Sequence, residues 1–222
     1  TVRGVTKSMV VVYDTSWGAY NHIKYNGYID NNASLSIRDV YSLTHNITKN
    51  LYVTNMAGLQ DATEWIDSFN NITSFNITLS KGEYVITANA LKNYRDSQNW
   101  RSRAVRGEIV SVHPRAFIDV NSKPIVINGN GATIKMTGND VNDDYHFAYI
   151  PKYGSLTLIN LTLSGFNTAI ENYGTFIAIN CTFTDNIIHH IVKVGDYGGV
   201  IRNYGTVFCS NSLFKNNGAN LG

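Results

Sequence analysis

The feature that most constrains the fold of this chain is a segment beginning with Tyr-Gly that occurs three times in its C-terminal part. The copies read YGSLTLINLTL from Tyr153, YGTFIAINCTF from Tyr173 and YGTVFCSNSLF from Tyr204. The first two copies are 20 residues apart and the last two are 31 apart, and the extra residues fit a loop around NIIHHIVKVGD. Such a period is typical of solenoids, in which one unit buries its apolar side chains only against its neighbours.

Each copy alternates apolar and polar residues, which is the period of a β-strand. In the first copy, Leu156 and Leu158 precede an asparagine, and the alternation resumes after it at Leu161 and Leu163. The asparagine stands six residues after every glycine, at Asn160, Asn180 and Asn211. Asparagine tolerates a left-handed backbone, and its amide can bond the amide of an equivalent asparagine. We therefore predict two strands per copy with a one-residue bend between them, and a structural ladder of asparagines in a parallel β-helix.

The same alignment assigns the cysteines and the outward positions. Cys181 aligns with Leu161 and Cys209 with Ala178, so we expect both to be small buried residues and not a disulfide. Apolar residues also align on the outer face, where Ile177 matches Phe208 and Ile159 matches Ile179. Exposed apolar lines usually contact another segment or a neighbouring subunit.

Weaker copies of the strand–turn–strand pattern precede these units, in FNITLSKGEYVIT (75–87) and KPIVINGNGATIKM (123–136). Before them, Met56, Leu59, Ala62 and Ile66 recur at helical spacing, which predicts an amphipathic helix over the end of the stack. The expected organisation is an N-terminal element of unknown fold at 1–52, a capping helix at 53–72 and a parallel β-helix at 73–222, with an Arg-rich insertion at about 89–118.

Short motifs add a resemblance to known families. GGVI at 198–201, FTDN at 183–186 and FKNN at 214–217 resemble the repeats of chlamydial polymorphic outer-membrane proteins and of adhesin-like proteins of methanogenic archaea. Residues 56–136 look like the first turns of pectin-lyase-type β-helices. The resemblance implies an all-β dominated, right-handed parallel β-helix with an N-terminal α/β capping element that includes one amphipathic helix. It also implies a non-catalytic, adhesin-like or structural surface module.

Composition points to the cell exterior and away from nucleic acid. Charged residues make up 15% of the chain and the net charge is +2, which argues against a polyanionic partner. No apolar run approaches the roughly 18 residues of a membrane span. Four Asn-x-Ser/Thr triplets are glycosylation candidates, at Asn32, Asn46, Asn71 and Asn76. We therefore expect an extracellular, cell-surface protein.

The densest polar stretch is KNYRDSQNWRSRAVRGEIVSVHPR at 92–115. One interpretation is a loop that grips an acidic glycan, with guanidinium groups on carboxylates and an indole on a sugar face. Its glycan-contact residues would be Arg95, Trp100, Arg101, Arg103 and Arg106. The alternative, which we favour, is a solvated insert whose arginine stems cover apolar surface.

A second polar loop, GNDVNDDYH, offers carboxylates that suit Ca²⁺, from Asp140, Asp143 and Asp144. Asp, Asn and Gly are also ordinary turn residues, and a plain turn is the preferred interpretation. No cofactor is predicted, and no residue is assigned a catalytic role, because the acids that a lyase or glycosidase needs do not converge in the sequence.

The expected partners are surface glycans or another cell-surface protein. The chain ends in NNGANLG without a terminal helix, and an uncapped parallel edge favours either further units or head-to-tail self-association into filaments. Two other functions share this fold: a carbohydrate-active enzyme, either polysaccharide lyase or glycosidase, and a viral receptor-binding fibre.

Overall fold

A computed structural model describes residues 48–68, 73–98, 102–105, 108–111, 115–121, 123–138, 145–188 and 199–219. The chain divides into two compact parts, residues 1–47 and residues 48–222, and every described residue belongs to the second part. The expected N-terminal element at 1–52 therefore lies outside the described residues, apart from its last few. These last residues belong to a strand of the second part, Thr48–Val53.

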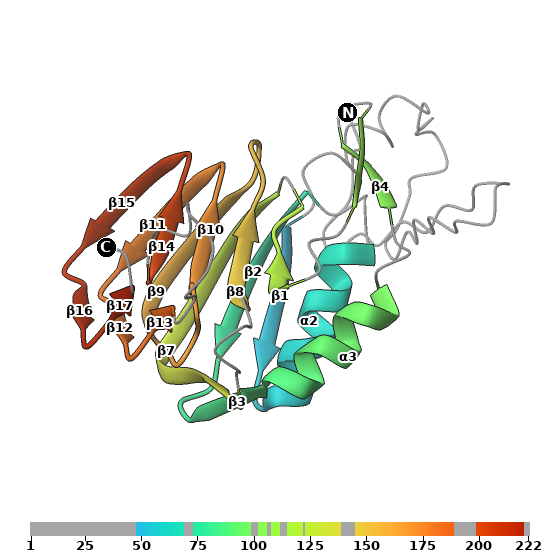
Figure 1. The fold of residues 1–222 in the computed structure, drawn as a ribbon. Helices are drawn as coiled ribbons and strands as arrows, with labels where there is room; N and C mark the ends of the chain where they lie inside the picture. Colours follow the sequence, from blue (N-terminus) through green and yellow to red (C-terminus); the bar gives the residue numbers. More distant parts are fainter. Residues whose placement is uncertain are drawn as a thin grey trace, which may run out of the picture. The chain divides into compact units, whose positions relative to one another are not determined.

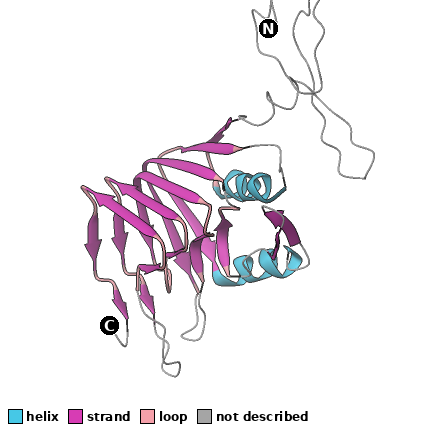
Figure 2. Ribbon diagram, turned by 90° about the horizontal axis from the view of Figure 1, so that it is seen from above, coloured by secondary structure: helices cyan, strands magenta, loops and turns pink. Residues whose placement is uncertain are grey.

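The described residues are mostly strands, with two helices among them (Figures 1 and 2). The helices are α2 (Met56–Ser68) and α3 (Ala88–Gln98). The strands are β1 (Thr48–Val53), β2 (Ser74–Leu79), β3 (Glu83–Thr87), β4 (Ser102–Val105), β5 (Glu108–Ser111), β6 (Ala116–Asp119), β7 (Pro124–Thr137), β8 (His146–Ile150), β9 (Ser155–Ser164), β10 (Ile170–Asn172), β11 (Thr175–Ile179), β12 (Thr182–Thr184), β13 (Ile187–Ile188), β14 (Ile201–Asn203), β15 (Thr206–Ser210), β16 (Leu213–Lys215) and β17 (Gly218–Ala219).

Parallel pairing dominates the sheets. A nine-stranded sheet runs in the order β1-β2-β7-β9-β11-β15, with β3 paired to β7 and with β12 between β9 and β16. A four-stranded sheet runs β14-β10-β8-β6, and β13 pairs with β17. All of these pairs are parallel, and only β4 and β5 pair antiparallel among the described strands. Figure 1 shows β1, β2, β7, β9, β11 and β15 side by side in one stack.

The Tyr-Gly units pair residue for residue. Phe176 lies opposite Leu156 on one side and opposite Val207 on the other. The register is kept although the first pair is 20 residues apart in sequence and the second 31. The bend residues Asn160, Asn180 and Asn211 share a left-handed backbone with φ of 52°, 53° and 49°. Asn180 donates its side-chain amide to Asn160 Oδ1 over 3.1 Å.

The glycines of the Tyr-Gly units allow neighbouring turns to approach closely. A Cβ atom on Gly174 would collide with the carbonyl oxygens of Gly154 and Pro151. A Cβ on Gly205 would in turn collide with the carbonyl oxygen of Gly174. Only a residue without a side chain therefore fits this corner of the second and third units.

Alternating side chains form buried lines across the strands. The lines are Ile125, Leu156 and Phe176; Ile127, Leu158 and Ala178; and Ile134, Leu163 and Phe183. Among the described residues, each line ends on the third Tyr-Gly unit, where the side chains become more exposed. Cys209, which continues the line of Ala178, is exposed, whereas Cys181 is buried. The expectation that Cys209 is buried is wrong, because no strand pairs with the far side of β15 among the described residues.

The predicted amphipathic helix is confirmed at the start of the stack, over the shorter range of α2. Asn55 caps it by accepting a hydrogen bond from the Gly58 N–H over 2.9 Å. Leu59, Ala62 and Ile66 are buried, and α2 contacts β1, β3 and β6. At its last turn, Lys123 Nζ donates to the Ile66 carbonyl over 3.1 Å, so a cation lies at the C-terminal end of the helix.

The range of the expected Arg-rich insertion, about 89–118, contains regular structure. Helix α3 begins where the Thr87 hydroxyl oxygen accepts the Ala90 N–H over 3.1 Å. Its apolar residues Leu91 and Tyr94 are buried. The hairpin β4–β5 follows, and β6 then pairs with β8 in the four-stranded sheet. The insertion therefore contributes a second helix and an edge strand.

Candidate functional site

The four-stranded sheet brings together polar residues that are far apart in sequence. Asp119 on β6 lies opposite Tyr149 on β8, which lies opposite Glu171 on β10. Glu171 lies opposite Arg202 on β14. Adjacent strands are spaced by about 4.8 Å, so Asp119 and Glu171 are roughly 10 Å apart at their Cα atoms. We call Asp119, His146, Tyr149, Glu171 and Arg202 the polar line.

Glu171 is the centre of this line. Its Oε2 atom lies 3.2 Å from His146 Nε2 and 3.9 Å from Arg202 Nη1. The other imidazole nitrogen, His146 Nδ1, lies 3.0 Å from the Thr168 carbonyl oxygen and must carry a proton to bond it. His146 is fully buried and Glu171 nearly so. A carboxylate with this little water depends on its partners, and removing one of them would leave a buried charge.

Tyr173 and Tyr204 extend the aromatic surface next to Tyr149 of the polar line. The ring of Tyr173 lies 5.8 Å from that of Tyr149 and 4.7 Å from that of Tyr204, with the second pair nearly parallel at 16°. The Tyr173 hydroxyl donates to Glu171 Oε1 over 3.3 Å. Burial, followed by the negative charge of Glu171, raises the pKa of Tyr173 to about 12. Tyr173 is therefore a neutral hydrogen-bond donor at physiological pH.

The arrangement offers two kinds of chemistry. Exposed aromatic rings beside polar groups suit the apolar faces and hydroxyls of sugars, and Tyr204 is 61% exposed. An inverting glycosidase requires two carboxyl groups separated by about 6.5–9.5 Å, and Asp119 and Glu171 are two carboxylates placed two strands apart in the same sheet. Both carboxylates are buried, however, so a substrate could reach them only if the side chains that cover them moved away.

The polar line was not predicted from the sequence, although the sequence carries a signal for it. Two tetrapeptides end in Asn-Tyr-Gly and occupy equivalent positions in consecutive units, one beginning at Glu171 and the other at Arg202. Their first residues carry opposite charges. Once the units are stacked in register, these two side chains must lie on adjacent strands. Asp119 and His146 lie outside the Tyr-Gly units, and no local pattern connects them to Glu171.

Most of the sequence-predicted site residues lie outside the described side chains. Arg95 belongs to α3 and Arg103 to β4 by their backbones alone. Outside the described residues lie Trp100, Arg101, Arg106, Asp140, Asp143, Asp144, Asn32, Asn46 and Asn71. The remaining glycosylation candidate, Asn76, lies on β2, where its side-chain amide donates to Asn50 Oδ1 over 3.1 Å. Asn76 thus contributes to an asparagine pair like that of Asn160 and Asn180.

No group of three or more His, Cys, Asp or Glu side chains converges for a metal ion in the part of the chain that the structure describes. The calcium hypothesis for Asp140, Asp143 and Asp144 is therefore not addressed by these residues. Neither described helix has the length and apolar character needed to cross a bilayer.

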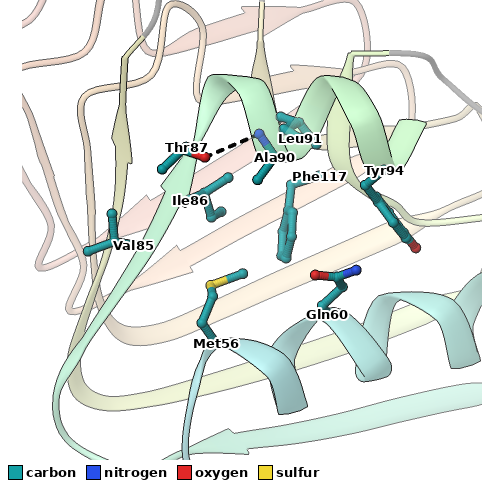
Figure 3. A pocket seen from close by; sticks show the side chains of 9 residues that line it. All are labelled: Met56, Gln60, Val85, Ile86, Thr87, Ala90, Leu91, Tyr94 and Phe117. Atoms are coloured by element: carbon teal, nitrogen blue, oxygen red, sulfur yellow. Dashed lines mark hydrogen bonds between the residues drawn. The ribbon is translucent and has the colours of Figure 1, made fainter. Parts of the chain in front are cut away.

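A second candidate site is a pocket of about 180 Å³ between the two helices (Figure 3). Its walls are mainly apolar, formed by Met56, Val85, Ile86, Ala90, Leu91 and Phe117. The polar groups at its edge are the Gln60 amide, the Thr87 hydroxyl that caps α3, and Tyr94, whose hydroxyl bonds Thr63 over 3.1 Å. The lining holds no charged side chain, so it suits a small apolar group.

No protein-family model, curated protein or solved structure matches this chain.

Proposed function

We propose that residues 73–222 wind as a right-handed parallel β-helix and serve as a non-catalytic, adhesin-like or structural module of an extracellular surface protein. Its partners would be surface glycans or another cell-surface protein. The observation that carries the proposal is the in-register pairing of the three Tyr-Gly units across two different sequence offsets. A chain that returns to the same strand position in every unit has the connectivity of a solenoid.

This geometry favours a binding surface over a single reaction centre. Each unit repeats its outward side chains at an interval of about 4.8 Å along the stack. The stacked rings of Tyr173 and Tyr204, which occupy equivalent positions in consecutive Tyr-Gly units, belong to one such line. A polymeric ligand lying along it would make several weak contacts at once, and linked contacts raise the overall affinity.

Binding to polysaccharides tests the proposal. The full chain is run in affinity gels or on glycan arrays that hold neutral and acidic polysaccharides, with and without calcium. We expect retention on at least one glycan class without new reducing ends or unsaturated products. Y204A should lose retention, and the matched control Y52A should keep it, because Tyr52 is 70% exposed on β1 at the opposite end. Turnover of any polysaccharide would contradict the non-catalytic role.

A carbohydrate-active enzyme is the second candidate, supported by the polar line. Glu171 contacts an imidazole, a tyrosine hydroxyl and a guanidinium, and Asp119 stands two strands away. If the protein cleaves a polysaccharide, E171Q should abolish turnover while leaving the fold intact by circular dichroism. If E171Q and the parent chain both bind without cleavage, this candidate is rejected.

A further inference from the structure

The third Tyr-Gly unit presents a surface that the first two units keep buried. Val207, Cys209 and Phe214 continue the buried lines of Phe176, Ala178 and Phe183. The Phe214 ring stacks on Phe183 at 4.9 Å and 13°, yet it remains 46% exposed. Tyr204 likewise stacks on Tyr173 and is 61% exposed. We call Tyr204, Val207, Cys209, Phe214 and Asn217 the open end.

Backbone groups of the open end match the groups that bond one unit to the next. β15 and β16 each pair with one strand only among the described residues. Within the stack, the Asn180 N–H donates to the Ser210 carbonyl and the Leu213 N–H to the Cys181 carbonyl, over 3.0 and 2.8 Å. The equivalent N–H and carbonyl groups that β15 and β16 direct away from the stack form an edge, and another strand can add to this edge.

Asparagine side chains give this edge a sequence preference. Asn186 is buried, and its Oδ1 accepts the Phe166 N–H over 3.0 Å from the preceding unit. Asn217 Oδ1 in turn accepts the Asn186 N–H over 3.0 Å. In this series the Asn217 N–H is the donor for the next asparagine. An incoming strand therefore needs an aromatic residue followed three positions later by an asparagine, as in Phe183 with Asn186 and Phe214 with Asn217.

The opposite end of a second copy does not fit this surface. Lys49 on β1 stands in the line of Phe75, which continues through Ile125, Leu156, Phe176 and Val207. Its ammonium lies 4.4 Å from the ring centroid of Trp65 on α2. Head-to-tail stacking would bring this cation against Val207 and cover it with apolar surface. A buried charge without an opposite partner is costly.

We infer that the open end binds an extended polypeptide segment of the Tyr-Gly pattern, which adds as a parallel strand beside β15 and β16. The occupant carries apolar residues opposite Val207 and Cys209, an aromatic ring on Phe214, and an asparagine whose Oδ1 accepts the Asn217 N–H. The surface is continuous with the two unit-to-unit interfaces already in the stack. The inference rests on this pairing and is independent of glycan binding.

A peptide with the sequence of residues 173–188, carrying C181S, tests the inference on the full chain. Cys209 is the exposed thiol, so its modification rate, located by mass spectrometry, reports occupancy of the open end. At a peptide concentration of about ten times Kd, mass action predicts modification about tenfold slower. The same peptide carrying N186A, and a scrambled peptide, should protect Cys209 much less.

Variants of the protein locate the effect. F214K should abolish protection, whereas V85K, an exposed apolar-to-lysine change on β3, should keep it. Three results would overturn the inference: no protection by the matched peptide at millimolar concentration, equal protection by the scrambled peptide, or protection of F214K equal to that of V85K. Sedimentation without peptide supplies a further test, because a dimer or filament that already shields Cys209 would mean that a second copy is the occupant.

Discussion

The two ends of the strand stack differ in how they finish the core. At the first end, α2 packs its buried residues Leu59 and Ile66 near β1, β3 and β6, and Lys49 replaces an apolar residue in the line of Phe75. At the open end, the buried lines of Ala178 and Phe183 finish in Cys209 and Phe214, which water reaches. Among the described residues, a helix and a charge finish one end of the stack, whereas the other end keeps the side chains that stacking requires.

This comparison predicts the largest difference for a leucine-to-alanine pair. L59A removes a fully buried side chain at the α2 end and should lower the free energy of unfolding by about 2–5 kcal/mol. L213A removes a side chain that is 55% exposed on β16 and should cost less than about 1 kcal/mol. Urea unfolding followed by circular dichroism measures both. Equal losses would mean that the two ends do not differ as described.

Two asparagines give the next largest contrast. Asn186 accepts the Phe166 N–H and donates to the Leu163 carbonyl over 3.2 Å inside the stack. N186A should cost about 1–3 kcal/mol, because it leaves buried backbone groups without partners. Asn217 makes the equivalent bonds one unit later, where water can replace them, so N217A should cost less. A larger loss for N217A in the same urea experiment would contradict this order.

The cysteines sharpen the comparison without changing the fold. Cys209 is exposed and Cys181 is buried. Burial raises the pKa of the Cys181 thiol, and partial loss of water around the Cys209 thiol also raises its pKa. A thiol reagent should therefore modify one cysteine in the folded protein and the second only after denaturant is added. C209S should remove the first phase and C181S the second. Modification of Cys181 under native conditions would show that the stack opens between its second and third units.

The smallest effect concerns alkaline pH and the tyrosine stack. Burial and Glu171 raise the pKa of Tyr173 from 10.0 to about 12 in the folded state. The unfolded chain then loses its proton first, so stability that is fully present below pH 10 falls as the pH rises towards 12. Y173F should make the unfolding free energy fall less steeply across that window.

Y204F is the matched control for Y173F, since Tyr204 lies on the open end and Tyr173 is the one that donates to Glu171. Stability measured from pH 9 to 12 should show a shallower slope for Y173F than for Y204F. Identical slopes would place the alkaline sensitivity elsewhere in the chain.

Sequence reasoning worked best where the period of the chain is set by backbone geometry. The strand alternation, the bend asparagines and the pairing of Ile177 with Phe208 all follow from aligning Tyr-Gly, because each depends only on neighbours one unit away. The amphipathic α2 was visible for a similar reason. Its apolar residues repeat at the helical period over several turns.

The failures involve information that a local pattern does not hold. Cys209 has the alignment of a buried residue, but its burial depends on a strand beyond β15. Helix α3 was hidden by the charged residues of its range, although Thr87 is an N-cap signal. The polar line needs β6, β8, β10 and β14 to be assembled in order before Asp119, Glu171 and Arg202 share a face.

The unequal spacing of the Tyr-Gly units has a practical consequence. β11 holds the same register with β9 as with β15, although the connection to β15 is 11 residues longer, as the offsets of 20 and 31 residues require. The difference enters between β13 and β14, away from the strands that set the register. Foreign sequences of varied length could therefore be grafted at this one corner of the scaffold while the strands on either side stay aligned.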